Sequence, residues 1–238
     1  MKTIAMIPAR YAATRFPGKL MQLLGDKTII ARTYENTMAT RLFDEVIVVT
    51  DSEIIFNEIT QYGGYVIMSK QPHESGSDRI AEAIADLDVD IVVNVQGDEP
   101  FVKKEPLQHL LKAFNAIDVQ VASLMHQIKD EKIITDINTV KVVVDNNSNA
   151  LLFSRSKIPY PREASLSPLY FKHIGVYAYR KDALMRFTAL PITPLEFAEK
   201  IECLRYLENG IPIKMIITDE PGPSIDTPDD LVRAMEWL

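Results

Sequence analysis

Cysteine is almost absent from this chain of 238 residues, because Cys203 is the only one. A single cysteine excludes both a disulfide framework and a cluster of thiolate metal ligands. Such scarcity is typical of a reducing compartment, so we expect a cytoplasmic protein. Long hydrophobic runs are missing too: the first apolar run ends at Pro8, too short for a secretion signal or a membrane span. We therefore expect no membrane partner.

Positive charge is also scarce. The formal net charge is −7 at pH 7, and the phosphates of a nucleic acid would repel such a protein. We expect no nucleic-acid partner, and any anionic ligand must meet a local group of cations. The glycine-rich motifs G-x-G-x-x-G and G-x-x-x-x-G-K-[ST] are both absent. Their absence disfavours a dinucleotide-dependent dehydrogenase and leaves phosphate binding to cationic side chains.

The first hundred residues contain an alternation of strands and helices. Apolar strands are expected at residues 2–8, 44–51, 65–69 and 90–96, and helices at 26–42, 52–64 and 75–87. This pattern predicts an α/β fold with a mixed, mainly parallel sheet and helices on both faces. Ligands of such sheets bind beyond the carboxyl ends of the strands.

The second half has unevenly spaced strands and predicts an extension of the sheet with a small lobe. Strands are expected at residues 119–128, 139–145, 150–155, 171–180 and 211–218, and helices at 181–188, 195–209 and 228–238. Residues 159–168 have the composition of a loop. No repeat or flexible linker divides the chain, so we expect one domain.

A loop with three cations, Arg10, Arg15 and Lys19, follows the first predicted strand. One cation on a loop is usually only solvated. Three of them on a proline-stiffened loop at the end of a strand favour phosphate binding, because guanidinium forks match phosphate oxygens and an ammonium adds a point charge. Thr50 and Asp51 end the second strand and should lie at the same edge of the sheet.

Two carboxylates are candidates for a magnesium site. Asp98 follows the fourth strand in the sequence NVQGDEP, and Asp226 precedes a helix that begins at Thr227-Pro228 with Asp230 in the capping-box position. Mg²⁺ prefers one or two carboxylates together with phosphate oxygens and water. The alternatives are an aspartate in an ordinary turn and an acid that complements a helix dipole.

Three further stretches carry polar side chains. Residues 75–79 place Ser75, Gly76 and Arg79 at the start of a helix, whose free N–H groups suit an anion or a base edge. Arg155 ends one strand, and His173 and Tyr177 lie on another. A lone histidine is more often structural than catalytic, and the sequence contains no recognisable nucleophile triad.

These motifs, in this order, resemble those of the 3-deoxy-manno-octulosonate cytidylyltransferases. The matching stretches are IPARYAATRFPGK, TD, HESGSDR, NVQGDEP, VKVVVD, LFSR, KHIGVYAYR and IDTPDDL, and the resemblance covers residues 4–236. It implies the Rossmann-like fold of the nucleotide-diphospho-sugar transferases with a small dimerisation and sugar-binding lobe. It also implies a homodimer that uses Mg²⁺ to transfer CMP from CTP to 3-deoxy-D-manno-octulosonate (KDO), giving CMP-KDO and pyrophosphate for lipopolysaccharide biosynthesis.

The resemblance also implies roles for individual residues and segments. Residues 1–118 would form the nucleotide-binding half, 119–220 the sugar-binding and dimerisation part, and 221–238 a helix returning to the active site. Arg10, Arg15, Lys19, Thr50, Asp51, Ser75, Gly76, Arg79 and Gln96 would bind the nucleotide, with Arg15, Lys19, Asp98 and Asp226 catalytic. Asp98 and Asp226 would bind the metal, and Lys141, Arg155, His173, Tyr177 and Glu202 the sugar.

One departure from the family pattern leaves the sugar open. Cys203 stands where the family commonly has glutamine, which removes an amide donor and acceptor near the sugar. The alternatives are a cytidylyltransferase for another acidic sugar, such as 8-amino-KDO or a nonulosonate, and a nucleotide-binding regulator without catalysis.

Overall fold

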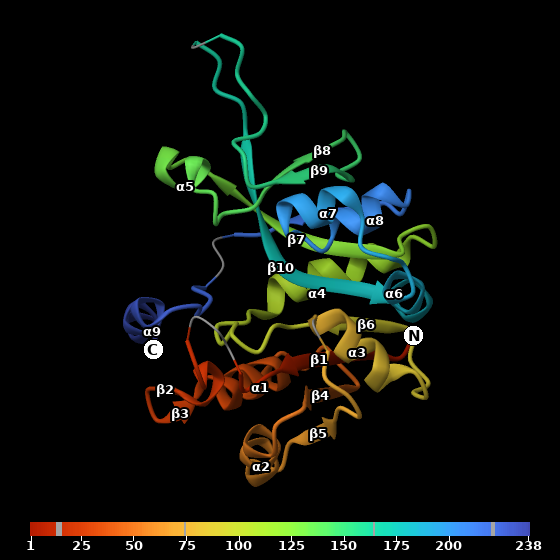
Figure 1. Cartoon of the computed structure of the whole chain (residues 1–238), viewed down its shortest axis with the longest axis vertical. Coiled ribbons are helices and arrows are strands. Elements are labelled where there is room, and N and C mark those ends of the chain that lie inside the picture. Colours follow the sequence, from red (N-terminus) through yellow and green to blue (C-terminus); the bar gives the residue numbers. More distant parts are fainter. Residues whose placement is uncertain (13–15, 74, 164, 220–221) are drawn as a thin grey trace.

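The computed structural model describes residues 1–12, 16–73, 75–163, 165–219 and 222–238 (Figure 1). A nine-stranded sheet runs through it, with seven strands in the order β11-β7-β10-β6-β1-β4-β5 and the pair β8–β9 attached to β10. The strands are β1 (Thr3–Ala9), β4 (Glu45–Thr50), β5 (Tyr65–Met68), β6 (Ile91–Asn94), β7 (Val121–Ile128), β8 (Lys141–Val144), β9 (Ala150–Ser154), β10 (Tyr170–Arg180) and β11 (Ile213–Ile217).

The helices cover both faces of this sheet. They are α1 (Ile29–Ala39), α2 (Glu53–Gln61), α3 (Gly76–Ile84), α4 (Lys104–Lys112), α5 (Glu131–Thr135), α6 (Lys181–Thr188), α7 (Pro194–Glu199), α8 (Leu204–Glu208) and α9 (Pro228–Ala234). Short 3₁₀ turns cover Lys19–Met21, Ala113–Asn115 and Met235–Trp237, and β2 (Leu23–Leu24) and β3 (Lys27–Thr28) form a separate small hairpin. None of the described helices is long and apolar enough to cross a membrane.

The sheet is mixed and mainly parallel, which confirms the predicted fold class. β6, β1, β4 and β5 run parallel, whereas β10 lies antiparallel between β6 and β7, and β11 is parallel to β7. Side chains alternate along β1: Ile7 packs into one core with Ile30 of α1, and Met6 into the other core with Ile80 of α3. An apolar strand buried on both faces therefore explains the continuous hydrophobic run at the start of the chain.

The lobe of the second half consists of β8, β9 and α5, with the segment between β9 and β10 extending beyond them (Figure 1). One predicted helix is wrong here, because residues 195–209 form two helices. α7 starts at Pro194 and ends at Glu199, its C-cap Lys200 has a left-handed φ of 53°, and α8 begins after Cys203. Cys203 is therefore the N-cap residue of α8 and not a mid-helix residue.

Candidate active site

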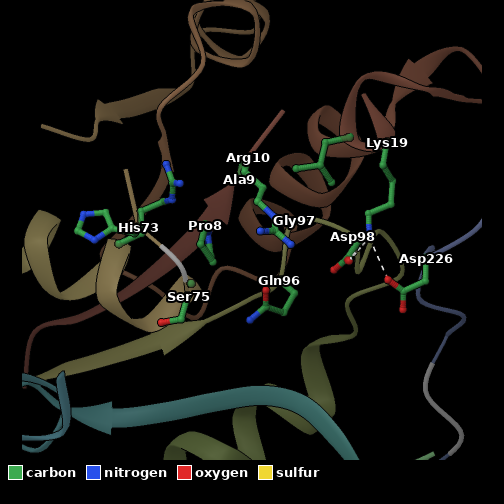
Figure 2. Close-up of a pocket in the computed structure, with 13 residues that line it drawn as sticks. Pro8, Ala9, Arg10, Lys19, His73, Ser75, Gln96, Gly97, Asp98 and Asp226 are labelled. Carbon is green, nitrogen blue, oxygen red and sulfur yellow. Dashed lines mark hydrogen bonds and ion pairs between the residues drawn. The ribbon is translucent and has the colours of Figure 1, made fainter. Parts of the chain in front are cut away.

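A cavity of about 220 Å³ lies beyond the carboxyl ends of β1 and β6. These two strands are hydrogen-bonded neighbours, with Met6 opposite Asn94, so the loops that follow them meet at one edge of the sheet. Figure 2 shows side chains from four parts of the chain facing this space. Its lining includes Pro8, Arg10, Lys19, His73, Ser75, Gly76, Arg79, Gln96, Asp98 and Asp226.

Lys19 joins the two candidate carboxylates. Its Nζ lies 2.5 Å from Oδ2 of Asp98 and 3.1 Å from Oδ1 of Asp226, and the lysine side chain is only 12% exposed (Figure 2). Burial lowers the pKa of Lys19, but the charges and hydrogen bonds of Asp98 and Asp226 together raise it by more. The pKa of Lys19 therefore lies above its ordinary value. Three residues far apart in the sequence thus form one charged group, with the ammonium between two carboxylates.

Local structure fixes each member of this group. Gly18 has a φ of 64°, which glycine tolerates best, and it starts the 3₁₀ turn that carries Lys19. The backbone carbonyl of Asp98 accepts a hydrogen bond of 3.0 Å from the N–H of Ile225, so the segment before α9 lies beside the turn after β6. Asp226 is therefore placed by a backbone contact as well as by its charge.

The capping box of α9 completes the placement of Asp226. The Thr227 side chain accepts from the N–H of Asp230, and a carboxylate oxygen of Asp230 accepts from the N–H groups of both Asp226 and Thr227. This confirms the predicted capping box. The Asp230 carboxylate accepts hydrogen bonds from backbone N–H groups at the start of α9. Of the three acids Asp226, Asp229 and Asp230, only Asp226 lines the cavity.

Most of the described residues predicted to bind the nucleotide line the cavity, but Thr50 and Asp51 do not. Ser75 is the N-cap of α3 and accepts from the N–H of Asp78, and a Cβ at Gly76 would lie only 3.1 Å from Pro8 Cγ. Arg79 is buried and donates to Asp51 at 2.8 Å and to Ser69 at 3.1 Å. Thr50 is also buried and caps the next turn by accepting from the N–H of Ser52. Arg10 lines the cavity, and Arg15 lies outside the described residues.

A second, deeper cavity of about 50 Å³ shares Gly76 and Gln96 with the first. Its other lining residues are Ser77, Asn94, Tyr177, Tyr179, Glu202, Cys203 and Tyr206. Burial raises the pKa of Glu202, although its hydrogen bond with Ser77 lowers it in part. Burial also raises the pKa of the Cys203 thiol to about 12. The predicted sugar residues Tyr177 and Glu202 thus meet in one polar cavity beside the charged group.

Three other predicted sugar residues contact other parts of the protein and line neither cavity. Lys141 is fully buried, and its Nζ donates to the carbonyls of Asp136, Thr139 and Arg155 at 2.5–2.8 Å. Burial lowers its pKa. Since an ammonium has three N–H donors, Lys141 has none left for a ligand in this arrangement.

Arg155 and His173 have comparable internal roles. Arg155 donates from Nε to the carbonyl of Glu199 at 2.7 Å, and from its terminal nitrogens to Ile137 and Lys200. His173 Nε2 lies 3.0 Å from Ser123 Oγ, and burial lowers its pKa to about 4. Their proposed contacts with the sugar therefore remain predictions, because the structure shows them bracing the strands and loops around the cavity.

Sequence reasoning missed several residues of the site. His73 lines the larger cavity and forms a short contact with Glu82 of α3, and it belongs to the HESGSDR motif. Asn94, Tyr179 and Tyr206 line the deeper cavity. The alternation of β10 gives the only sequence signal for Tyr179, because it lies two residues after Tyr177 and so on the same face of the strand.

Glu99 is another residue that the motif alone does not explain. It follows Asp98, and burial together with the nearby charge of Asp98 raises its pKa to about 8. Its side chain faces a different cavity, next to Phe101 and Leu107. The sequence GDEP thus directs one acid to the charged group and the next acid away from it.

A family model described as Cytidylyltransferase matches residues 4–216 of this chain. The 3-deoxy-manno-octulosonate cytidylyltransferase of Flavobacterium johnsoniae is 59% identical, with 100% of this chain and 99% of its own covered. The protein of the same name from Christiangramia forsetii is 57% identical, with 100% and 97% covered. The chain belongs to the 3-deoxy-manno-octulosonate cytidylyltransferase family.

Solved structures agree with this membership. A CMP:2-keto-3-deoxy-manno-octonic acid synthetase complexed with CTP is 38% identical and has a TM-score of 0.95, with 100% of this chain and 98% of that chain covered. A 4-diphosphocytidyl-2C-methyl-D-erythritol synthase from Anaerococcus prevotii is 16% identical with a TM-score of 0.65, over 99% and 98% of the two chains. The second match shows a shared fold alone. The family resemblance drawn from the motifs is therefore confirmed.

The two carboxylates of this family member fit a hard divalent cation. Asp98 and Asp226 direct oxygens toward one point, now held by the Lys19 ammonium, and Mg²⁺ takes one or two carboxylates with phosphate oxygens and water. Among the described residues no group of three or more His, Cys, Asp or Glu side chains is arranged to hold a metal.

Proposed function

We propose that the protein transfers CMP from CTP to the anomeric hydroxyl of KDO, giving CMP-KDO and pyrophosphate for lipopolysaccharide biosynthesis. The observation that carries this proposal is the convergence of Lys19, Asp98 and Asp226 on one cavity next to a polar cavity that contains Tyr177 and Glu202. Family membership supports the same reaction, because the curated relatives carry the name of this transferase.

The reaction is an in-line displacement at phosphorus. The anomeric hydroxyl of the sugar loses its proton to water as its oxygen forms a bond to the α-phosphorus of CTP, the bond from that phosphorus to the bridging oxygen breaks, and pyrophosphate leaves. The main obstacle is charge, because a sugar carboxylate must approach a polyphosphate. Cations at the phosphates offset this repulsion, and Arg10, Lys19 and Arg79 are the described cations that line the cavity. Arg15 would add a fourth by its place in the same loop as Arg10 and Lys19.

We propose Mg²⁺ as the metal that Asp98 and Asp226 hold. When bound, Mg²⁺ would supply positive charge to phosphate oxygens and orient the polyphosphate. Lys19 orients both carboxylates before the nucleotide arrives, because its ammonium contacts each of them. It can then neutralise charge on the departing pyrophosphate. Positioning and charge neutralisation account for most of the rate in phosphoryl transfer, so the proposal assigns no general base.

The nucleotide and the sugar would occupy different parts of the joined cavities. We assign Ser75, Gly76, Arg79 and Gln96 to the nucleotide, with Arg79 held in place by Asp51. We assign Tyr177 and Glu202 to the sugar because they line the deeper cavity.

The test is release of pyrophosphate from CTP and Mg²⁺ with a panel of acidic sugars: KDO, 8-amino-KDO and a nonulosonate. The proposal predicts the highest kcat/KM with KDO. A preference for another sugar would identify a sister transferase and would direct attention to Cys203, which lines the sugar cavity. Calorimetric binding of CTP without any turnover would instead identify a nucleotide-binding regulator.

We also propose that the protein is a homodimer in the cytoplasm. The lobe exposes large apolar side chains, namely Ile133, Leu151, Tyr160, Leu166 and Leu169, and an apolar surface of this kind on a soluble enzyme favours association. A second copy would cover it. Light scattering coupled to size-exclusion chromatography should give twice the chain mass of 26.9 kDa, and a monomer at micromolar concentration would refute the dimer.

A further inference from the structure

The hydroxyl of Tyr206 is buried and has no hydrogen-bond partner among the described residues. The residue is 2% exposed and lines the deeper cavity. Buried tyrosine hydroxyls nearly always have a partner, because leaving such a group without one costs free energy. An unpaired hydroxyl on a residue that lines a cavity therefore indicates that a polar group of a ligand, or a water, forms a hydrogen bond with it there.

The ring of Tyr206 cannot turn away from this position. It stacks on Phe187 with a centroid distance of 4.0 Å and an angle of 11°, and its centroid lies 6.1 Å from that of Tyr179 at an angle of 22°. Tyr179 in turn stacks on Tyr177. This row of rings holds the Tyr206 hydroxyl at the cavity before any ligand arrives, so binding would not have to order it.

The other polar groups of the cavity influence one another. Ser77 and Asn94 partly offset the effect of burial on the pKa of Tyr179, and Ser77 partly offsets it for Glu202. Cys203 adds to the effect of burial in raising the pKa of Tyr177. Among the described tyrosines that line the cavity, Tyr206 is the one with a buried hydroxyl that has no hydrogen-bond partner.

The size of this cavity and its position beside the larger cavity limit which part of a substrate can bind there. Its volume of about 50 Å³ exceeds the roughly 10–15 Å³ that one water requires by this measure. It lies next to the larger cavity, because Gly76 and Gln96 line both, and this places it within reach of a substrate bound at Asp98. The space suits a short chain with hydroxyl groups, such as the exocyclic end of an octulosonate.

The charge of the cavity decides which end of the sugar enters. Among the described residues that line it, Glu202 is the one charged side chain, and it is an acid. A second carboxylate would be repelled there, whereas hydroxyl groups can donate to Glu202. The carboxylate end of the sugar must therefore stay near the cations of the larger cavity.

We propose that Tyr206 is a specificity-determining residue whose hydroxyl hydrogen-bonds the terminal hydroxyl of the acceptor sugar's exocyclic chain. The proposal deepens the proposed function and rests on it, because it assumes an acidic sugar acceptor. It assigns the deeper cavity to the neutral end of the sugar. It also explains why the protein keeps a buried hydroxyl that no described side chain or backbone group satisfies.

The test compares wild type with Tyr206→Phe on two acceptors, KDO and 8-deoxy-KDO. With KDO, Tyr206→Phe should raise KM for the sugar about tenfold, the effect of one lost hydrogen bond. The KM for CTP and the kcat at saturating sugar should not change, because the contact is the same in the ground and transition states. With 8-deoxy-KDO, which lacks the hydroxyl, the two proteins should have equal KM values.

Tyr170→Phe is the matched control, because the hydroxyl of Tyr170 is also buried without a partner among the described residues but lies away from both cavities. It should leave every kinetic constant unchanged. The melting temperature of Tyr206→Phe should be at least that of wild type, since no internal hydrogen bond is lost. Three results would overturn the proposal: an unchanged KM for KDO, an equal loss with both acceptors, or a lowered melting temperature that accounts for the kinetic change.

The outcome of this test is separable from that of the proposed function. If wild type releases no pyrophosphate with KDO, the proposed function fails. The comparison of wild type and Tyr206→Phe is then made with the acidic sugar that the panel identifies and with its analogue lacking the terminal hydroxyl. If wild type uses KDO but Tyr206→Phe does so equally well, only the assignment of Tyr206 fails.

Discussion

Replacing Lys19 by methionine should abolish most of the activity and leave the fold intact. Methionine keeps most of the apolar stem and removes only the ammonium, which lies 2.5 Å from Asp98 and 3.1 Å from Asp226. The lysine side chain is 12% exposed, so water cannot replace its charge at the departing pyrophosphate. Removal of such a catalytic donor costs at least about 2 kcal/mol of transition-state stabilisation, which is roughly a thirtyfold loss in kcat/KM.

The stability of Lys19→Met should change much less than its activity. Asp226 is 48% and Asp98 25% exposed at the side chain, so solvent screens the two carboxylates once the ammonium is gone. The free energy of unfolding should therefore stay within about 1 kcal/mol of wild type. Urea denaturation measures this quantity, and a pyrophosphate-coupled assay with CTP and KDO measures kcat and KM.

Lys27→Met provides the matched control for this experiment. Lys27 also pairs with one acid, Glu35, at 2.5 Å, but it lies outside both cavities. Its replacement should leave kcat/KM at the wild-type value. The reasoning would be refuted if Lys19→Met kept more than half of the wild-type kcat/KM, or if its activity and stability fell in proportion.

Three further predictions concern single side chains. Asp98→Asn should abolish turnover while circular dichroism and melting temperature remain near wild type, and wild-type activity would disprove the metal assignment. The pKa of His173 is about 4 in the folded protein against an ordinary 6.5, so the unfolded state binds more protons between these values. The free energy of unfolding should therefore fall by up to about 3 kcal/mol as the pH drops from 6.5 to 4, and the drop should shrink in His173→Gln. Lys141→Met should lower the free energy of unfolding by about 2–4 kcal/mol, because three buried carbonyls lose their donor; unchanged urea denaturation would refute that role.

The sequence is enough to predict the sheet and the position of the site. Strands such as β1 and β4 are apolar on both faces, and this property is visible in the sequence as continuous apolar runs, TIAMIPA and EVIVVT. Because parallel strands end at one edge, the positions of Lys19 and Asp98 after their strands already predict that the two side chains lie near each other. The convergence of Asp226 required the family resemblance, since nothing in its local pattern sets its distance from Asp98.

The remaining features depend on packing that no local pattern encodes. Lys141, in the motif VKVVVD, turns inward to backbone carbonyls because a loop folds over it. The helix predicted at 195–209 breaks at Lys200, which adopts a left-handed φ without being glycine or asparagine. The position of the unpaired Tyr206 hydroxyl depends on the packing of three elements, namely α8, which carries Tyr206, α6 with Phe187, and β10 with Tyr179. Such contacts are long-range, so residue-by-residue reading cannot predict them.

The central claim is that Lys19, Asp98 and Asp226 together receive the triphosphate and its cation. A crystal structure of the protein with CTP and Mg²⁺ tests this most directly. The account predicts triphosphate density in the cavity between Arg10 and Lys19, with one ion bound by the carboxylates of Asp98 and Asp226. Triphosphate density elsewhere, with Lys19 still paired to both carboxylates and no ion on them, would contradict it.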